Sequence, residues 1–232
     1  MGTCLFAPST YHAASLAQIG GGTNRGDASG ALAAPGSEAG PCPTLLRATD
    51  EMLLQAEQPK GWTELEHLPQ HRLERSIGII RVEAPADIVF AVVTDYDGFE
   101  RFMPMVSAST KEGEREGKAV VRQSIKLPFP ISNRHFVIEV ESRDQQTRRG
   151  WRCLESRWSY VQGSGNIAEG YGRWEVLEDG LGRALVAYVG FVDPGGRLPG
   201  WAFTWATRQG LPRILQAVQR EARRRAPAAN VR

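Results

Sequence analysis

The sequence predicts an α+β fold in which a curved antiparallel sheet wraps around one long carboxy-terminal helix. A series of short segments rich in β-branched and aromatic residues, separated by turn residues, extends from Val106 to Val192. After Asp193-Pro194-Gly195-Gly196 the apolar period changes from two residues to about 3.6, and the stripe from Trp201 to Ala222 predicts a helix. Short neighbouring strands with tight turns favour an antiparallel meander, and the helix is then expected to lie on one face of it.

Two segments precede the main domain. Residues 1–43 are rich in Gly, Ala, Ser and Pro and carry too little apolar surface to form a core, so we expect a disordered or non-native extension there. Residues 44–61 are expected to form a short amphipathic helix, from the helical spacing of their apolar residues, followed by a linker. The main domain is expected at residues 62–226, with a flexible tail at 227–232.

Within the main domain, strands alternate with turns around two short helices. The predicted strands are Trp62–His67, Leu73–Val82, Val106–Lys111, Lys118–Leu127, Arg134–Ser142, Gly150–Tyr160, Asn166–Leu177 and Arg183–Val192. Ala84-Pro85-Ala86-Asp87 predicts a helix start, because proline tolerates the first turn and an acidic side chain suits its positive end. That helix is expected to reach about Thr94, and a shorter one is expected from Gly98 to Phe102.

Charge and cysteine content limit the partners and the compartment. The chain carries 28 Lys and Arg against 26 Asp and Glu, a net charge of +2, which argues against a dedicated nucleic-acid binder. Cys4, Cys42 and Cys153 are odd in number and widely spaced, so we expect neither a disulfide framework nor a metal site. A reducing compartment, the cytoplasm, follows from that expectation. We expect no cofactor.

A sheet that grips one helix is expected to leave a cavity. One helix is about 10 Å across, narrower than a trough of several twisted strands, so large side chains or a pocket must occupy the rest. Strand alternation and the helical stripe place the candidates inward. They are Gln123, Arg134, Ser156, Trp158, Trp174, Tyr188 and Gly190 from the strands, and Trp201 and Trp205 from the helix. Gly190 is expected to leave room for a side chain. A closed core filled by the aromatic residues stays open as an alternative.

Three motifs, in order, resemble the START and coenzyme Q-binding superfamily, which includes polyketide cyclases. They are Val82–Val106 (with VEAPADIVF, VVTDY and FMPMV), Pro128–Val137 (PFPISNRHFV) and Asp193–Trp201 (DPGGRLPGW). The resemblance implies the helix-grip fold and a tunnel for a lipid, sterol, quinone or polyketide, with Met103 and Met105 near its mouth. The START pattern often has an acid on each side of the arginine, where this chain has Asn133-Arg134-His135.

These observations favour a binding function over catalysis. The sequence lacks HExxH, GxSxG and a phosphate-binding glycine loop. We therefore expect the protein to bind a hydrophobic small molecule for transfer, sequestration or presentation. The alternative is a polyketide aromatase or cyclase that holds a reactive chain beside Tyr188, Arg134 or Ser156. A ligand-free interaction role stays open as a third possibility.

A cluster of arginines ends the predicted helix: Arg220, Arg223, Arg224 and Arg225. Cations at a helix carboxyl end complement the helix dipole, which is one interpretation. The other is peripheral contact with an anionic membrane, to which each basic residue contributes about 1 kcal/mol.

Overall fold

A computed structural model describes residues 40–226, apart from residues 70, 72, 128, 130, 148–149 and 197–199, and apart from the side chains of residues 200–207. The expected extension as far as residue 39 and the expected tail at 227–232 lie outside the described residues. Within the described part, short helices and strands are followed by a run of strands and one long helix, as predicted.

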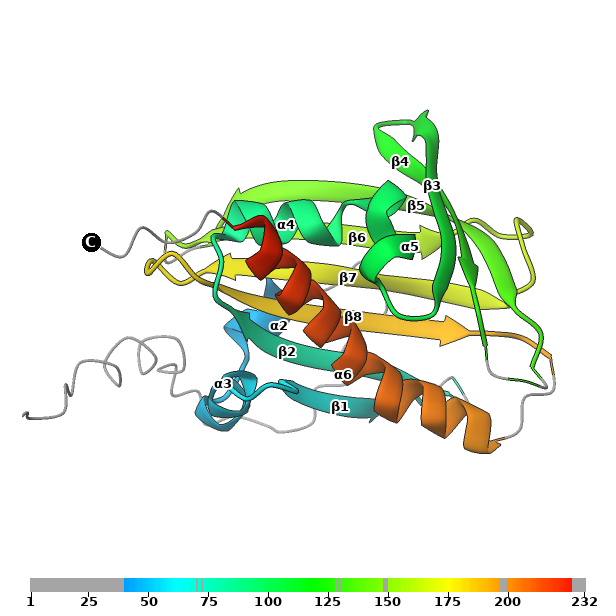
Figure 1. The fold of residues 1–232 in the computed structure, drawn as a ribbon, viewed down its shortest axis with the longest axis horizontal. Helices are drawn as coiled ribbons and strands as arrows, with labels where there is room; N and C mark the ends of the chain where they lie inside the picture. Colours follow the sequence, from blue (N-terminus) through cyan, green and yellow to red (C-terminus); the bar gives the residue numbers. More distant parts are fainter. Residues whose placement is uncertain are drawn as a thin grey trace, which may run out of the picture.

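Eight strands of the described chain form one antiparallel sheet, which confirms the predicted fold class (Figure 1). They are β1 (Trp62–His67), β2 (Glu74–Val82), β3 (Val106–Arg115), β4 (Lys118–Ile125), β5 (Arg134–Gln146), β6 (Arg152–Tyr160), β7 (Glu169–Glu178) and β8 (Ala184–Asp193). Their order across the sheet is β1-β2-β8-β7-β6-β5-β4-β3. Strands β3 to β8 therefore form the expected meander, and β8 also pairs with β2, which joins the first two strands to it.

The long helix α6 (Gly200–Arg225) covers one side of one sheet face. It contacts β2 and β1 in the sheet, and α4 and α5 beside it (Figure 1). Gly78 of β2 allows this close approach, because a Cβ atom there would lie 2.8 Å from Cδ1 of Leu215. Pro212 lies inside α6. Among the described residues, no helix is both long and apolar enough to cross a membrane.

Short helices between β2 and β3 cover part of the same face. Helix α4 (Ala86–Val93) begins directly after Pro85 with Asp87 in its first turn, as the sequence predicted. Its buried valines face the sheet, and α4 contacts β6, β7 and α6. The short 3-10 helix η1 (Tyr96–Gly98) and α5 (Phe99–Phe102) follow and pack against β3.

The opposite sheet face is covered by the amino-terminal helices. In place of the single helix expected there, α2 (Pro43–Leu46) and α3 (Asp50–Ala56) are separated at Thr49, whose Oγ1 accepts a hydrogen bond from the Met52 backbone N–H and so starts a new helix. Buried residues of both helices pack on outward-facing strand residues such as Leu185. Cys42 and Pro43 are already buried, so packing begins two residues before the expected boundary at 44.

A disulfide joins Cys42 to Cys153, and the prediction that the cysteines form none is wrong. The two residues are 111 positions apart; Cys42 precedes α2, and Cys153 lies in β6 on the face that α2 covers. A buried carboxylate, Glu175, holds α2 in place by accepting hydrogen bonds from the backbone N–H groups of Thr44 and Leu45. Because disulfides persist mainly in oxidising environments, cysteine content no longer supports a reducing compartment. The cytoplasmic location stays a prediction.

Candidate ligand-binding cavity

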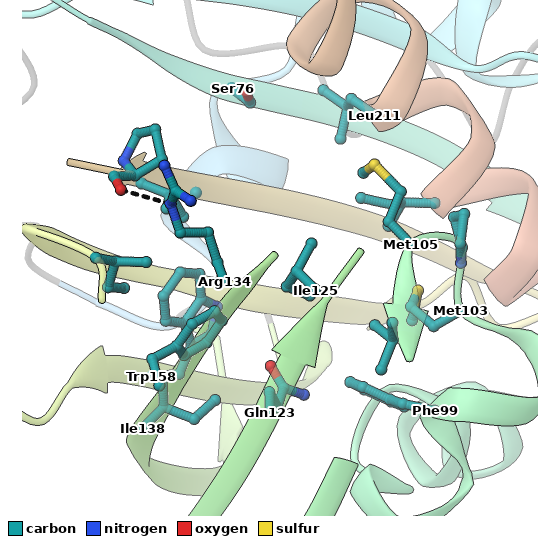
Figure 2. A pocket seen from close by; sticks show the side chains of 18 of the residues that line it. Ser76, Phe99, Met103, Met105, Gln123, Ile125, Arg134, Ile138, Trp158 and Leu211 are labelled. Carbon is teal, nitrogen blue, oxygen red and sulfur yellow. Dashed lines mark hydrogen bonds between the residues drawn. The ribbon is translucent and has the colours of Figure 1, made fainter. Parts of the chain in front are cut away.

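A cavity of about 280 Å³ lies between α6 and the sheet (Figure 2). Helix α6 contributes Leu211 and Ile214 to one wall, and β4, β5, β6, β7 and β8 contribute inward-facing side chains to the others. Most lining residues are apolar or aromatic. The space exists because a single helix does not fill the trough of the curved sheet, as the sequence predicted.

Most of the predicted cavity residues line this space. They are Gln123, Arg134, Trp158, Trp174, Tyr188 and Gly190, together with Met103 and Met105. Strand alternation brings them to one face, because register pairs such as Trp174 with Tyr188 place both side chains on the same side of the sheet. The side chains of Trp201 and Trp205 lie outside the described residues. That any of these residues binds a ligand stays a prediction.

Ser156 is buried just behind the cavity wall and is hydrogen-bonded to a residue that lines it. It is fully buried and does not line the cavity, but its Oγ lies 3.0 Å from the hydroxyl oxygen of Tyr96, which does. Burial raises the pKa of Tyr96 to about 12, and the hydrogen bond with Ser156 only partly opposes this effect. The pair therefore holds a neutral hydroxyl at the cavity wall.

Tyr188 and Gly190 share the inward face of β8, and the expectation that Gly190 leaves room for a side chain is wrong. A Cβ atom at Gly190 would lie 2.4 Å from the Tyr188 hydroxyl oxygen, so the tyrosine ring already occupies that space. The ring of Trp174 stands beside it, with ring centroids 4.7 Å apart. Burial raises the pKa of Tyr188 to about 12, so its hydroxyl stays neutral at physiological pH.

Gln123 and Arg134 bring polar groups to the cavity from neighbouring strands. The Gln123 Nε2 donates to Ser109 Oγ at 3.2 Å, which satisfies part of this buried amide. The guanidinium of Arg134 donates to the backbone oxygens of Ser132, Pro194 and Gly195. It therefore links the start of β5 to the turn that follows β8.

Met103 and Met105 belong to the turn between α5 and β3. Both line the cavity, and Met103 is buried. Met105 has a φ of 66°, in the left-handed region that non-glycine residues rarely adopt. Its carbonyl accepts a hydrogen bond from the Lys126 N–H at 2.8 Å, which ties the turn to the end of β4. That the two methionines form the cavity mouth stays a prediction.

Several lining residues were not among the candidates. Tyr96 and Phe99 come from η1 and α5, where strand alternation gives no signal. Glu74 and Ser76 share the inward face of β2, and alternation along the segment Leu73–Val82 would have found them. Strand alternation therefore identifies lining residues of the sheet, whereas those of the short helices depend on tertiary packing.

An antiparallel sheet that grips a carboxy-terminal helix with an apolar cavity between them defines a helix-grip protein. The chain belongs to the family described as polyketide cyclase/dehydrase and lipid transport, whose family model matches residues 70–226. The resemblance drawn from the three sequence motifs is confirmed at this level.

Curated relatives include phosphatidylcholine transfer proteins. The chain is 34% identical to the Homo sapiens protein over 116 residues, which cover 47% of this chain and 54% of that protein. It is 28% identical to the Bos taurus protein over 112 residues, covering 45% and 53%. The chain therefore spans about half the length of the curated relatives it matches.

Solved structures share the fold at low identity. A STAR-related lipid transfer protein from Xanthomonas axonopodis matches with a TM-score of 0.59 and 23% identity, covering 69% of this chain and 92% of that one. The Zhui aromatase/cyclase from Streptomyces sp. R1128 matches with a TM-score of 0.51 and 21% identity, covering 67% and 97%. At these identities the likeness shows the fold alone.

Proposed function

We propose that this protein binds a hydrophobic small molecule in the cavity beneath α6, for transfer, sequestration or presentation. The cavity itself carries the proposal: about 280 Å³ of space with mostly apolar walls and a few polar groups. Small-molecule sites have this character, in which apolar surface provides affinity and a few polar groups orient the ligand. A core filled by the same aromatic side chains would leave few voids larger than a water molecule.

The similar proteins support the same function class. The curated relatives are named for the transfer of phosphatidylcholine, and the Xanthomonas axonopodis structure is named a lipid transfer protein. Carried to this chain, these names favour a lipid, sterol-like, quinone or polyketide-type molecule as the ligand class.

Native mass spectrometry and a fluorescent probe test this proposal. Freshly purified protein is expected to carry a non-covalent apolar adduct, and the delipidated protein is expected to bind N-phenylnaphthylamine with an increase in probe fluorescence. Oleyl alcohol is expected to displace the probe. Absence of both an adduct and probe binding would reject the binding function.

A polyketide aromatase or cyclase is the second candidate, and the hydrogen bond between Tyr96 and Ser156 is the observation that favours it. This pair holds two hydroxyl groups in a fixed geometry at the cavity wall, as positioning catalysis requires. Burial, however, raises the pKa of Tyr96 and of Tyr188 to about 12, far from the neutral range where acid–base groups are most efficient. We therefore place binding first. Cyclisation of a poly-β-ketone thioester that is lost in Tyr96→Phe would reverse this order.

We further propose weak peripheral contact between the end of α6 and anionic membranes. Of the four arginines there, Arg224 and Arg225 donate to Glu221, and Arg225 also donates to Asp95. These acids compensate the two cations. Arg220 and Arg223 are exposed and take no ion pair within the described residues, so membrane contact would depend on them. Two such residues contribute on the order of 2 kcal/mol.

A further inference from the structure

The guanidinium of Arg134 is a buried cation without an acidic partner. Arg134 is 9% exposed. Its Nε donates to the Pro194 carbonyl at 2.7 Å, Nη1 donates to the Ser132 carbonyl at 2.7 Å and to Ser132 Oγ at 3.0 Å, and Nη2 donates to the Gly195 carbonyl at 3.4 Å. All four acceptors are neutral. No carboxylate oxygen of the described residues lies within 4.0 Å, so the positive charge is uncompensated.

The other buried arginines in the described chain each form an ion pair with a carboxylate. Arg75 and Arg81, each 3% exposed, lie on the opposite sheet face. Arg75 Nη2 lies 2.6 Å from Glu66 Oε2, and Arg81 Nη1 lies 2.9 Å from Asp179 Oδ2. Burial of an unpaired charge is costly, and a carboxylate offsets that cost for both. Only the arginine that lines the cavity lacks such a partner within the described residues.

Arg134 retains one donor for a partner inside the cavity. A guanidinium has five N–H groups in a fixed planar arrangement. The four hydrogen bonds of Arg134 use one N–H on Nε, two on Nη1 and one on Nη2, and the bond from Nη2 is the longest. The second N–H of Nη2 therefore stays available at a residue that lines the cavity (Figure 2). A carboxylate or phosphate oxygen suits this donor best, because hydrogen bonds between ions are about twice as strong as neutral ones.

Glu74 is the other charged residue that lines the cavity, and it lies near the same end. Glu74 lies on the inward face of β2, two residues before Ser76, which pairs with Gly190 of β8. Glu74 therefore lies near the end of β8. Arg134 of β5 reaches the same end, where it donates to the Pro194 carbonyl. Glu74 is partly exposed, whereas Arg134 is buried. Its charge is therefore better screened than that of Arg134, and the buried cation dominates this end of the cavity.

The cavity volume limits the apolar part of the ligand. At about 280 Å³ it lies just below the range of roughly 300–1,000 Å³ that is usual for small-molecule sites. We therefore take a single acyl chain as the apolar part of the ligand.

We propose that Arg134 forms an anion subsite of the cavity, where it binds a carboxylate or phosphate oxygen at the head of a single-chain amphiphile. The proposal rests on the proposed binding function and names the ligand chemistry of that site. Arg134 keeps its hydrogen bonds to Ser132, Pro194 and Gly195, and the head group takes the remaining Nη2 donor.

Oleate and oleyl alcohol test the subsite, because they share one chain and differ in the charge of the head group. Displacement of N-phenylnaphthylamine gives both dissociation constants below the critical micelle concentrations. The parent protein is expected to prefer oleate by at least about tenfold, and Arg134→Gln is expected to abolish this preference. The ratio of the two constants is the readout, because a general loss of the cavity weakens both ligands alike. Arg134→Lys, which keeps the charge, is expected to retain part of the preference.

A second variant leaves the hydrogen bonds of Arg134 intact. Glu74→Gln removes a nearby negative charge and is expected to increase the preference for oleate about twofold to fivefold. A decrease would place the head group elsewhere and overturn the subsite. Oleoyl lysophosphatidate replaces oleate in a third arm, and the tighter of the two identifies carboxylate or phosphate as the preferred anion.

The outcomes separate this proposal from the binding function. Equal affinity of the parent protein for oleate and oleyl alcohol overturns the anion subsite and leaves the binding function standing. Failure of the parent to bind oleate, oleyl alcohol and the fluorophore rejects both. Tighter binding of a diacyl phosphatidylcholine than of oleate overturns the single-chain limit, and with it the proposal.

Discussion

The ring of Tyr188 lies over Gly190, two residues further along the same face of β8. A Cβ atom at Gly190 would stand 2.4 Å from the Tyr188 hydroxyl oxygen and 2.6 Å from the ring carbon that carries it. A side chain at this position has to displace the tyrosine ring, because the ring uses the space that the side chain would take. The neighbouring Trp174 ring, with a centroid distance of 4.7 Å, restricts movement of the tyrosine away from it.

Gly190→Leu is therefore expected to destabilise the protein by about 1–3 kcal/mol, as overpacking does. Denaturant unfolding measures the change. Tyr188→Ala removes the ring that causes the clash. Tyr188→Ala should therefore lower the free energy of unfolding less in the Gly190→Leu variant than in the parent protein. Additive losses in the double variant would contradict the assignment of the clash to Tyr188.

Ser76→Leu is expected to narrow the cavity without overpacking the core. Ser76 lines the cavity and has no hydrogen bond through its hydroxyl within the described residues, so the substitution breaks no polar contact. Binding of N-phenylnaphthylamine should weaken at least about tenfold, or 1.4 kcal/mol. Ser159→Leu, an exposed position of β6, is the matched control. Equal affinity of both variants would mean that the probe binds outside the cavity.

Cys42→Ser is expected to lower the free energy of unfolding by about 2–5 kcal/mol, because the bond to Cys153 closes a long loop in the unfolded chain. Denaturant unfolding with and without dithiothreitol measures this contribution. The reductant should destabilise the parent protein to a similar extent and leave Cys42→Ser unchanged. A parent that is equally stable in both conditions would show that the bond contributes nothing.

Acid is expected to remove the contribution of Glu221 at the end of α6. Hydrogen bonds from Arg224, and then from Arg225, lower the pKa of this carboxyl from 4.5 to about 2. A depressed folded-state pKa stabilises the protein fully above the unfolded value, and the contribution is lost as pH falls from about 4.5 to about 2. Glu221→Gln should therefore cost about 1–2 kcal/mol at neutral pH.

The difference in unfolding free energy between the parent and Glu221→Gln should close over this acid range, as measured by denaturant unfolding at a series of pH values. Glu64→Gln, an exposed carboxyl of β1, is the control and should show no such convergence. A constant difference between parent and Glu221→Gln would exclude an ionic origin.

Replacing Arg220 and Arg223 by alanine is expected to reduce flotation with phosphatidylserine-containing vesicles at low salt. The control pair Arg47→Ala with Lys60→Ala removes the same charge from exposed positions near the amino-terminal helices and should float like the parent protein. Salt should weaken the parent's attachment, because ions screen charges at an exposed surface. Equal flotation of the two double variants would reject membrane contact through the end of α6.

The sequence by itself determined the sheet, the long helix and most of the cavity wall. Residues such as Arg134, Trp158 and Trp174 could be placed inward because alternation along a strand depends only on near neighbours in the chain. The change of apolar period after Gly196 likewise located α6 without knowledge of its packing. These are local patterns, and a single sequence contains them in full.

Only the tertiary structure decided which groups meet across the sheet. The bond between Cys42 and Cys153 depends on α2 lying against β7 and β8, beside the strand β6 that holds Cys153, which no spacing of cysteines encodes. Two backbone partners of Arg134, the carbonyls of Pro194 and Gly195, come from the turn after β8, some 60 residues later in the chain. The clash at Gly190 depends on the direction of the Tyr188 side chain, which packing against Trp174 selects. Such contacts depend on register, connection and rotamer together, and the local sequence specifies none of these alone.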